Sequence, residues 1–272
     1  MYWTTCVKRI NCNCPDPDMT ISPDKKIYFL SDFHLGAPDS ESSLVREKKV
    51  VAFLESIKHQ ASQVFIVGDI FDFWYEYRKV VPKGYTRLLG KLAELTDNGV
   101  PVHVFVGNHD MWMSGYFEKE LNIQVYHHPK TFEWNGKKFF IGHGDGLGPG
   151  DHGYKFIKKI FRNPLCQWMF GQLHPTWGIG LANYFSRKSR EKTGAADEIF
   201  LGEENEWLII YCKEILKREH FDYFIFGHRH LPLDLPLPGN SRYINLGDWI
   251  RNFTYADFDG TDMRLHKFSD QL

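Results

Sequence analysis

The sequence predicts an α/β protein, and two patterns carry that prediction. Short apolar runs rich in β-branched and aromatic residues recur along the chain, and each run ends in a polar loop. Amphipathic helical patterns separate the first three of these runs. Strands that alternate with helices are typical of an α/β core. The 272 residues are 43% hydrophobic and 16% aromatic, which allows one large domain or a domain with an insertion and excludes disordered and fibrous proteins.

The expected strands and helices follow one another in a regular order. Apolar residues at helical spacing predict helices over residues 50–57 and 88–95, with Gly99 ending the second. A further helix is expected over residues 207–216, directly before a strand. Buried strands are expected at residues 27–30, 64–67, 102–106, 139–141, 223–226 and 243–246.

Residues 146–202 interrupt this order. We interpret them as a helical cap inserted into a core formed by residues 23–145 and 203–272. Large apolar side chains are frequent in this interval, and residues 152–190 contain no Asp or Glu. That combination suits an anionic amphiphile. The whole chain has a net charge of -1, which argues against a nucleic-acid-binding surface. The basic residues of the interval are Lys155, Lys158, Lys159, Arg162, Arg187, Lys188 and Arg190.

The N-terminal segment and the cysteines indicate a cytoplasmic protein. We expect residues 1–22 to form a disordered tail without strand or helix periodicity. The five cysteines are an odd number, and three of them crowd the first 14 residues, which favours a reducing compartment over a disulfide framework. Cys12-x-Cys14 could bind a metal, but the pair lacks a second pair to complete a site. The sequence contains neither the long apolar run of a membrane span nor the apolar centre of a signal peptide.

Polar side chains with metal-binding chemistry follow five of the expected strands. In open α/β sheets, ligands bind beyond the carboxyl ends of the strands, so we expect these loops to meet in one site. The glycines allow sharp turns and close approach of the backbone. The five motifs are Asp32-x-His34, Gly68-Asp69-x-x-Asp72, Gly107-Asn108-His109-Asp110, Gly142-His143 and Gly227-His228-Arg229-His230.

The chemistry of these side chains predicts a divalent metal site. Carboxylates, an amide oxygen and imidazoles without a thiolate favour Mn²⁺, Fe or Zn²⁺. Each motif alone is weak, because a single buried histidine is more often a hydrogen-bonded core residue than a ligand. Five motifs in order, each after an expected strand, are not explained by coincidence. We assign no site role to the remaining histidines, which include His59, His103, His127, His128, His174, His220 and His266.

The ordered motif set resembles that of the calcineurin-like metallophosphoesterases from Ile27 to about Asp248. The resemblance implies a four-layer α/β/β/α sandwich and two metal ions bridged by Asp69. It also implies that Asp72 orients His109, which acts as a proton donor or phosphate contact. One ion would be held by Asp32, His34, Asp69 and His230, and the other by Asp69, Asn108, His143 and His228.

Three further segments, Gly68 to Trp74, His143 to Leu147 and Asp151 to Tyr154, are similar to one branch of that family. This branch hydrolyses the pyrophosphate bond of UDP-2,3-diacylglucosamine in lipid A biosynthesis. The resemblance implies a lipid-linked UDP-sugar substrate, the products UMP and 2,3-diacylglucosamine 1-phosphate, and peripheral contact with the cytoplasmic face of the inner membrane. The implied substrate contacts are Asn108, His109, Asp151, Tyr154, Arg187 and Arg190.

Two departures from that branch keep other functions open. This chain has His109 where the branch has arginine, and residues 186–193 match its cap only loosely. One alternative is a general phosphomonoesterase or phosphodiesterase that acts on a soluble substrate and uses the cap as a protein-binding lid. Another is a scaffold that retains the metal site without catalysis. The oligomeric state stays open.

Overall fold

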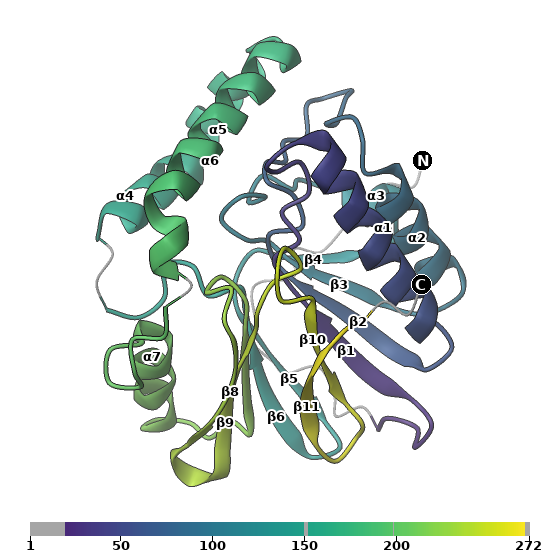
Figure 1. Cartoon of the computed structure of the whole chain (residues 1–272), viewed down its shortest axis with the longest axis vertical. Helices are drawn as coiled ribbons and strands as arrows, with labels where there is room; N and C mark the ends of the chain where they lie inside the picture. The colour runs from purple at the N-terminus through teal and green to yellow at the C-terminus, as the bar shows by residue number, and fades with distance from the viewer. Residues whose placement is uncertain (1–19, 150–151, 198, 270–272) are drawn as a thin grey trace, which may run out of the picture.

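The computed structural model describes residues 20–149, 152–197 and 199–269, and the side chains of residues 152 and 189–197 are not described. Two β-sheets pack face to face, with helices on both outer faces (Figure 1). This is the expected α/β/β/α arrangement. Most of the expected tail, residues 1–19, lies outside the described residues. Ile21 is buried, and its backbone N–H donates to Asn135 Oδ1 at 2.9 Å.

The first sheet has the strand order β11-β10-β1-β2-β3-β4. Strands β1 to β4 are parallel, whereas β10 and β11 are antiparallel to their neighbours. Their parallel direction brings the carboxyl ends of β1, β2 and β3 to the same edge. The strands are β1 (Lys26–Leu30), β2 (Ala61–Val67), β3 (Val102–Phe105), β4 (Gln124–Tyr126), β10 (Thr254–Phe258) and β11 (Met263–Lys267).

The second sheet has the strand order β5-β6-β7-β9-β8. Its central strands β6, β7 and β9 are parallel, and the two edge strands are antiparallel to their neighbours. The central strands therefore also end at a common edge. The strands are β5 (Lys130–Trp134), β6 (Lys137–Ile141), β7 (Tyr223–Phe226), β8 (Pro232–Leu237) and β9 (Ser241–Leu246), with the 3₁₀ helix η1 (Pro238–Asn240) between the last two.

Helices cover the outer faces of both sheets. Helices α1 (Ser40–Ile57), α2 (Thr86–Asp97) and α3 (Tyr116–Glu120) pack on the first sheet, and α7 (Trp207–Leu216) packs on the second (Figure 1). The Asp39 side chain caps α1 by accepting the N–H groups of Glu41 and Ser42. Helix α2 has no side-chain cap of its own, and Glu47 of α1 accepts its first N–H groups instead.

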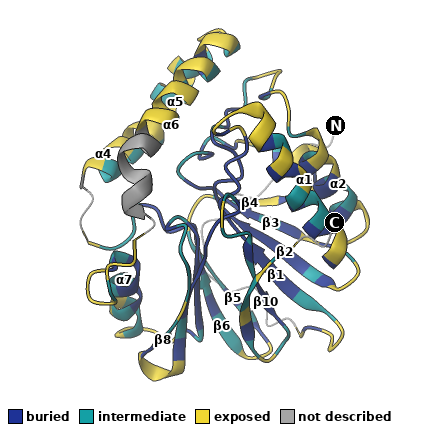
Figure 2. Ribbon diagram, viewed as in Figure 1, coloured by how far each residue is buried: buried dark blue, intermediate teal, exposed yellow. Residues whose placement is uncertain are grey.

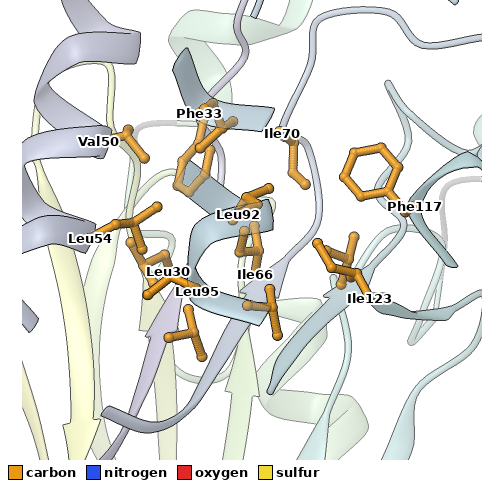
Figure 3. Close-up of a cluster of buried hydrophobic side chains, with 14 of the residues drawn as sticks. Leu30, Phe33, Val50, Leu54, Ile66, Ile70, Leu92, Leu95, Phe117 and Ile123 are labelled. Carbon is orange, nitrogen blue, oxygen red and sulfur yellow. The ribbon is translucent and has the colours of Figure 1, made fainter. Parts of the chain in front are cut away.

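Side chains alternate between the two faces of each strand, and the buried apolar residues form three layers. In β2, Val64 and Ile66 face the helices, while Phe65 and Val67 enter the layer between the sheets. Burial of both faces explains why these strands read as continuous apolar runs. In the helix-side layer, Val50 and Leu54 of α1 and Leu92 and Leu95 of α2 pack over Leu30 and Ile66 (Figure 3).

The predicted cap consists of three helices, α4 (His152–Phe161), α5 (Pro164–Gly171) and α6 (Pro175–Asp197). They stand away from the sandwich and expose much of their surface (Figure 2). Hydrogen bonds tie them to the core at several points: Trp112 Nε1 donates to Phe161 O at 2.7 Å, and Tyr75 Oη donates to Gln167 O at 2.8 Å. Among the described residues, no helix combines the length and apolar character needed to cross a bilayer.

All six expected strands form, but the sequence analysis missed β4, β5, β8, β10 and β11 and the short helix α3. Most of the missed strands lie at or next to a sheet edge, where polar residues are tolerated. Strand β8 also contains Pro232 and Pro236, which suit an edge strand because proline donates no backbone hydrogen bond. The helix expected over 50–57 is the apolar half of α1, whose polar first half gave no amphipathic signal.

Arg46 of α1 holds the loop that follows β1. It is buried, and its guanidinium donates to the backbone oxygens of Phe33, His34 and Ala37 at 2.9, 2.8 and 3.0 Å. We expect Arg46→Met to lower the free energy of unfolding by about 3 kcal/mol, because the loop carbonyls lose a charged donor. That corresponds to a fall in Tm of about 6–12 °C for a chain of this size.

Differential scanning calorimetry measures this change. The control is Arg87→Met, which makes the same substitution at an exposed arginine. Equal melting temperatures for the two variants would contradict the role of Arg46.

Candidate metal centre

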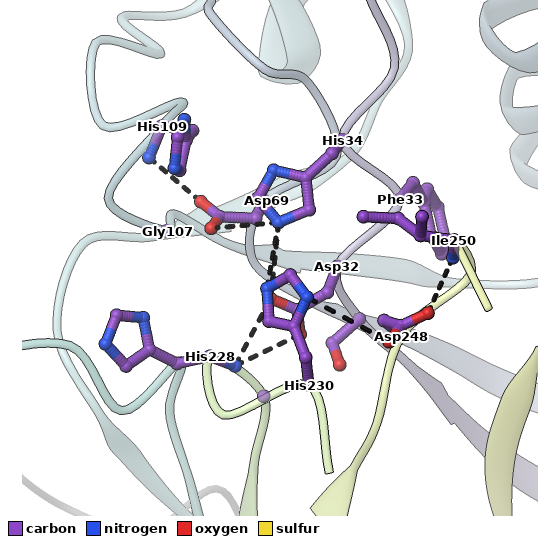
Figure 4. Close-up of polar contacts among 12 residues, drawn as sticks. Asp32, Phe33, His34, Asp69, Gly107, His109, His228, His230, Asp248 and Ile250 are labelled. Atoms are coloured by element: carbon purple, nitrogen blue, oxygen red, sulfur yellow. Dashed lines mark hydrogen bonds and ion pairs between the residues drawn. The ribbon is translucent and has the colours of Figure 1, made fainter. Parts of the chain in front are cut away.

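The five motifs predicted from the sequence meet at one edge of the sandwich. Three follow β1, β2 and β3 of the first sheet, and two follow β6 and β7 of the second. Figure 4 shows several of these side chains converging from different strands. All seven expected ligands take part in the contacts described below.

Five of the seven expected ligands have a left-handed backbone, with φ of 56° for Asp32, 43° for His34, 54° for Asp69, 69° for His228 and 52° for His230. This conformation is uncommon for residues other than glycine and is usually associated with strain at functional sites. The left-handed conformation turns the loop away from the strand and directs the side chain of the ligand residue towards the centre.

Asp32, His34 and His230 form the first group of ligand atoms. Asp32 Oδ1 lies 3.7 Å from His34 Nε2 and 3.4 Å from His230 Nε2. The two imidazole nitrogens lie 3.2 Å apart. Asp69 Oδ2 lies 3.6 Å from His34 Nε2 and so joins this group.

Asp69 also belongs to a second group, with His143, Asn108 and His228. Asp69 Oδ2 lies 3.3 Å from His143 Nε2. The Asn108 Oδ1 atom lies 3.1 Å from His143 Nε2 and 2.9 Å from His228 Nδ1. The same carboxylate oxygen therefore faces both groups, which is the position required of a bridging ligand.

Each of three imidazoles has an oxygen of the protein behind its ring, and the oxygen behind His143 lies at hydrogen-bond distance. His143 Nδ1 lies 2.9 Å from Val67 O, His34 Nδ1 lies 3.9 Å from Asp72 Oδ1, and His230 Nδ1 lies 3.9 Å from Asp248 Oδ2. Metal-binding histidines commonly have such an oxygen behind the ring, because it fixes the tautomer and the ring orientation. The donor types and this support fit divalent metal ions.

Two buried aspartates of the site were given no role of their own from the sequence, although Asp110 belongs to one of the five motifs. Asp248 follows β9, the one expected strand to which we assigned no site residue. It accepts the N–H groups of Ile250 and Arg251, and its Oδ2 lies 3.9 Å from His230 Nδ1. Asp110 accepts the N–H groups of Ile70 and Gly107, and thereby ties the loop after β2 to the loop after β3. Burial, reinforced by the Asp69 carboxylate, raises the pKa of Asp110 to about 7. A Gly-Asp pair after a buried strand was the available signal for Asp248.

Glycine is required beside two of the carboxylates. A Cβ atom on Gly107 would lie 2.0 Å from Asp69 Oδ1, and one on Gly227 would lie 2.4 Å from Asp32 Oδ2. Both distances are too short for any side chain. The expected close approach of the glycine backbone therefore occurs at the centre itself.

The electrostatics of the site favour a positive charge between its groups. Burial alone would raise the pKa of Asp69, but His143 and His109 together hold it well below its usual range. Burial opposes a proton on His143, yet the Asp69 carboxylate raises the pKa of that imidazole to about 10. In contrast, burial lowers the pKa of His34 to about 4. The field that favours a proton on His143 equally favours a divalent cation in its place.

His109 lies between the core and the cap. Its backbone N–H donates to Asp69 Oδ1 at 2.9 Å, and its Nδ1 lies 3.0 Å from the backbone oxygen of Asp72 and 3.6 Å from Asp72 Oδ1. The Oγ atom of Ser186 on α6 lies 3.1 Å from the same nitrogen. Asp72 thus contacts both His34 and His109.

The expected substrate contacts of the cap are only partly described. The Tyr154 hydroxyl donates to Asp145 Oδ2 at 2.5 Å, beside the loop that follows His143. Arg187 is exposed on α6. Asp151 lies outside the described residues, and the side chain of Arg190 is not described.

Comparison with known proteins agrees with this geometry. The family model for the calcineurin-like phosphoesterases matches residues 25–232. A UDP-2,3-diacylglucosamine hydrolase of Porphyromonas gingivalis is 44% identical over 90% of this chain and 98% of its own length. Proteins of the same name from Actinobacillus succinogenes and Pseudomonas aeruginosa are 26% and 25% identical, each over 89% of this chain and 99% and 98% of their own lengths. The chain belongs to the calcineurin-like phosphoesterase family.

Proposed function

We propose that this protein hydrolyses the pyrophosphate bond of UDP-2,3-diacylglucosamine to UMP and 2,3-diacylglucosamine 1-phosphate in lipid A biosynthesis. The observation that carries the proposal is the similarity, over nearly its whole length, to a UDP-2,3-diacylglucosamine hydrolase that is 44% identical. As a calcineurin-like phosphoesterase, the chain is a metal-dependent hydrolase. The exposed cap beside the metal centre supports the finer assignment of a lipid-linked substrate.

The two groups of donors would hold two divalent ions, with Mn²⁺ the best fit to their mixture of carboxylate, amide and imidazole ligands. Such ions polarise phosphoryl oxygens and lower the pKa of bound water. Asp32, His34 and His230 would hold one ion, Asn108, His143 and His228 the other, and Asp69 would serve both.

His109 has a separate task in this proposal. It lies beside Asp69, but the contact with that carboxylate is made by its backbone N–H and not by its ring. The imidazole therefore remains available to a substrate phosphate. A sugar phosphate with a second pKa of about 6 leaves without being protonated. The imidazole therefore needs only to donate a hydrogen bond to charge that develops on phosphate oxygen. Because Nδ1 faces the backbone oxygen of Asp72, this donor would be Nε2 of the doubly protonated ring.

The cap supplies apolar surface for acyl chains and cations for phosphate. Trp177 is 74% exposed, and Leu181, Tyr184 and Phe185 are also exposed on α6, the helix that places Ser186 against His109. Large apolar groups kept in water are a typical mark of a binding surface. We propose that this face takes the diacyl portion and that its cations, including Arg187, draw the enzyme to the cytoplasmic face of the inner membrane.

A substrate comparison tests the proposal. In detergent, with Mn²⁺ present, we expect kcat/KM for UDP-2,3-diacylglucosamine to exceed that for bis(4-nitrophenyl) phosphate by at least about 10³-fold, because remote binding energy is available only from the lipid-linked substrate. A preference for the soluble diester would support a general phosphodiesterase. Inactivity towards both substrates would support a scaffold.

Asp69→Ala should abolish hydrolysis and lower the metal content from two ions to one or none. The carboxylate faces both groups of ligands, and its loss leaves two cations to repel each other. Metal analysis by inductively coupled plasma mass spectrometry measures the stoichiometry. Asp24→Ala, at an exposed position, is the control. Two retained ions with full activity would remove Asp69 from the bridging position.

His109→Ala should lower kcat by about 10²-fold, the usual cost of one lost transition-state donor, and leave both ions bound. Steady-state kinetics together with metal analysis separates the two effects. A loss of metal comparable to that of Asp69→Ala would mean that His109 is a ligand.

Arg187→Glu combined with Arg190→Glu should raise KM for UDP-2,3-diacylglucosamine by about 10-fold or more and change the kinetics of the soluble diester by less than about twofold. The substitutions reverse charge on the cap and leave the ligands intact. Lys217→Glu combined with Arg218→Glu, both at exposed positions of the core, controls for the change in net charge. Equal effects on both substrates would contradict recognition of the lipid by the cap.

A further inference from the structure

A cavity of about 780 Å³ lies between α4 and the loops that follow β3, β4 and β6. His143, an expected metal ligand, forms part of its wall. Lys155 and Lys159 of α4 and Arg162, directly after this helix, line one side, and His127 and His128 of the loop after β4 line another. Neither the motif analysis nor the resemblance assigned a role to these two histidines.

The cavity is strongly cationic. Lys155, Lys158, Lys159 and Arg162 face a single lining carboxylate, Asp145. That carboxylate is already engaged, because it pairs with Lys158 and accepts the hydroxyl of Tyr154. Lys159 is exposed and forms no ion pair within the described part of the chain. An anion that entered the cavity would therefore meet positive charge that the protein itself does not neutralise.

Arg162 and the two histidines form a polar cluster at this wall. Arg162 Nη2 donates to His127 O at 2.8 Å, and Nη1 lies 3.5 Å from His128 Nδ1. Burial, and then the charge of Arg162, lower the pKa of both His127 and His128. Both imidazoles therefore favour the neutral form. Because His128 Nδ1 faces the Arg162 guanidinium, which can only donate, its Nε2 carries the proton and is the donor of that ring.

A second cavity continues this surface. It has a volume of about 520 Å³, shares His127, His128 and Arg162 with the first, and adds the aromatic rings of Tyr75 and Trp112. Aromatic side chains beside cations are the usual surface for stacking a nucleobase while holding its phosphate.

The position of the cavity separates it from the apolar face of the cap. Asp69 Oδ2 faces His143, which lines the cavity, whereas Asp69 Oδ1 accepts the N–H of His109, which contacts Ser186 on α6. A phosphate at the metal centre thus has a cationic, hydrogen-bonding cavity on one side and the exposed apolar helix α6 on the other.

We propose that the cavity lined by Lys155, Lys159, Arg162, His127 and His128 binds the nucleoside monophosphate half of the substrate. This inference rests on the proposed function and adds to it the location of the UMP moiety. An acyl chain does not favour a cavity with four cations, whereas a phosphate gains charge-assisted hydrogen bonds there. The volume lies within the range of about 300–1,000 Å³ that is usual for small-molecule sites.

The test measures UMP binding directly. Isothermal titration calorimetry with the Mn²⁺-loaded full-length protein gives the Kd of UMP for the wild type, Lys159→Glu and Arg162→Met. We expect each substitution to raise this Kd by at least about 10-fold, and Lys159→Glu to raise KM for UDP-2,3-diacylglucosamine by a similar factor.

Matched controls keep the result specific. Lys83→Glu makes the same charge reversal at an exposed lysine of the core and should leave the Kd of UMP unchanged. Because Arg162 also holds the loop after β4, Arg162→Lys should restore part of the affinity and a melting curve should accompany both Arg162 variants. An unchanged Kd for UMP in Lys159→Glu would overturn the proposal.

The products distinguish the two halves of the substrate. If Lys159→Glu weakened inhibition by 2,3-diacylglucosamine 1-phosphate and left UMP binding intact, the cavity would hold the sugar phosphate and the inference would be wrong. Binding of UMP is measured without turnover. A wild type that bound UMP through Lys159 but failed to hydrolyse the UDP-lipid would therefore overturn the proposed function and leave the cavity assignment standing.

Discussion

The position of the Asp69 carboxylate is the constraint on which the site depends. One oxygen of this buried group faces His34 on one side and His143 on the other, at 3.6 and 3.3 Å. Its backbone is left-handed. The carboxylate lies so close to Gly107 that no side chain fits at that position. Asp110 fixes the same region by accepting N–H groups from the loops after β2 and β3. A small displacement of any of these loops would alter both groups of ligands at once.

The sandwich itself explains how residues so distant in sequence reach this carboxylate. The first sheet contributes Asp32, His34, Asp69 and Asn108, and the second contributes His143, His228 and His230. The two sets meet only because apolar side chains such as Phe65, Phe139 and Ile225 hold the sheets face to face. The energy that aligns the ligands is therefore largely the burial of aromatic and aliphatic surface between the sheets.

In our proposals, chemistry and substrate selection reside in different parts of the chain. The strand-end loops would supply the metal ligands, and they bury Asp32, His34, Asp69 and His143. The cap helices α4, α5 and α6 are exposed and meet the core at a few points, including Trp112 and Tyr75. In our proposals α6 takes the acyl chains and α4 closes the nucleotide cavity, so that an insertion adds specificity without disturbing the ligand set.

The sequence by itself determined the fold class and the six central strands, and it predicted the seven residues that the structure brings together as candidate ligands. These features have local signatures: a strand buried on both faces is a continuous apolar run, and a ligand follows it within a few residues. Only the tertiary structure decided the edge strands, the position of Asp248 beside His230, and the cavity that joins His127 and His128 to Arg162. Each depends on groups far apart in the chain, and their contact exists only once burial of the apolar layers has fixed the sheets and helices in place.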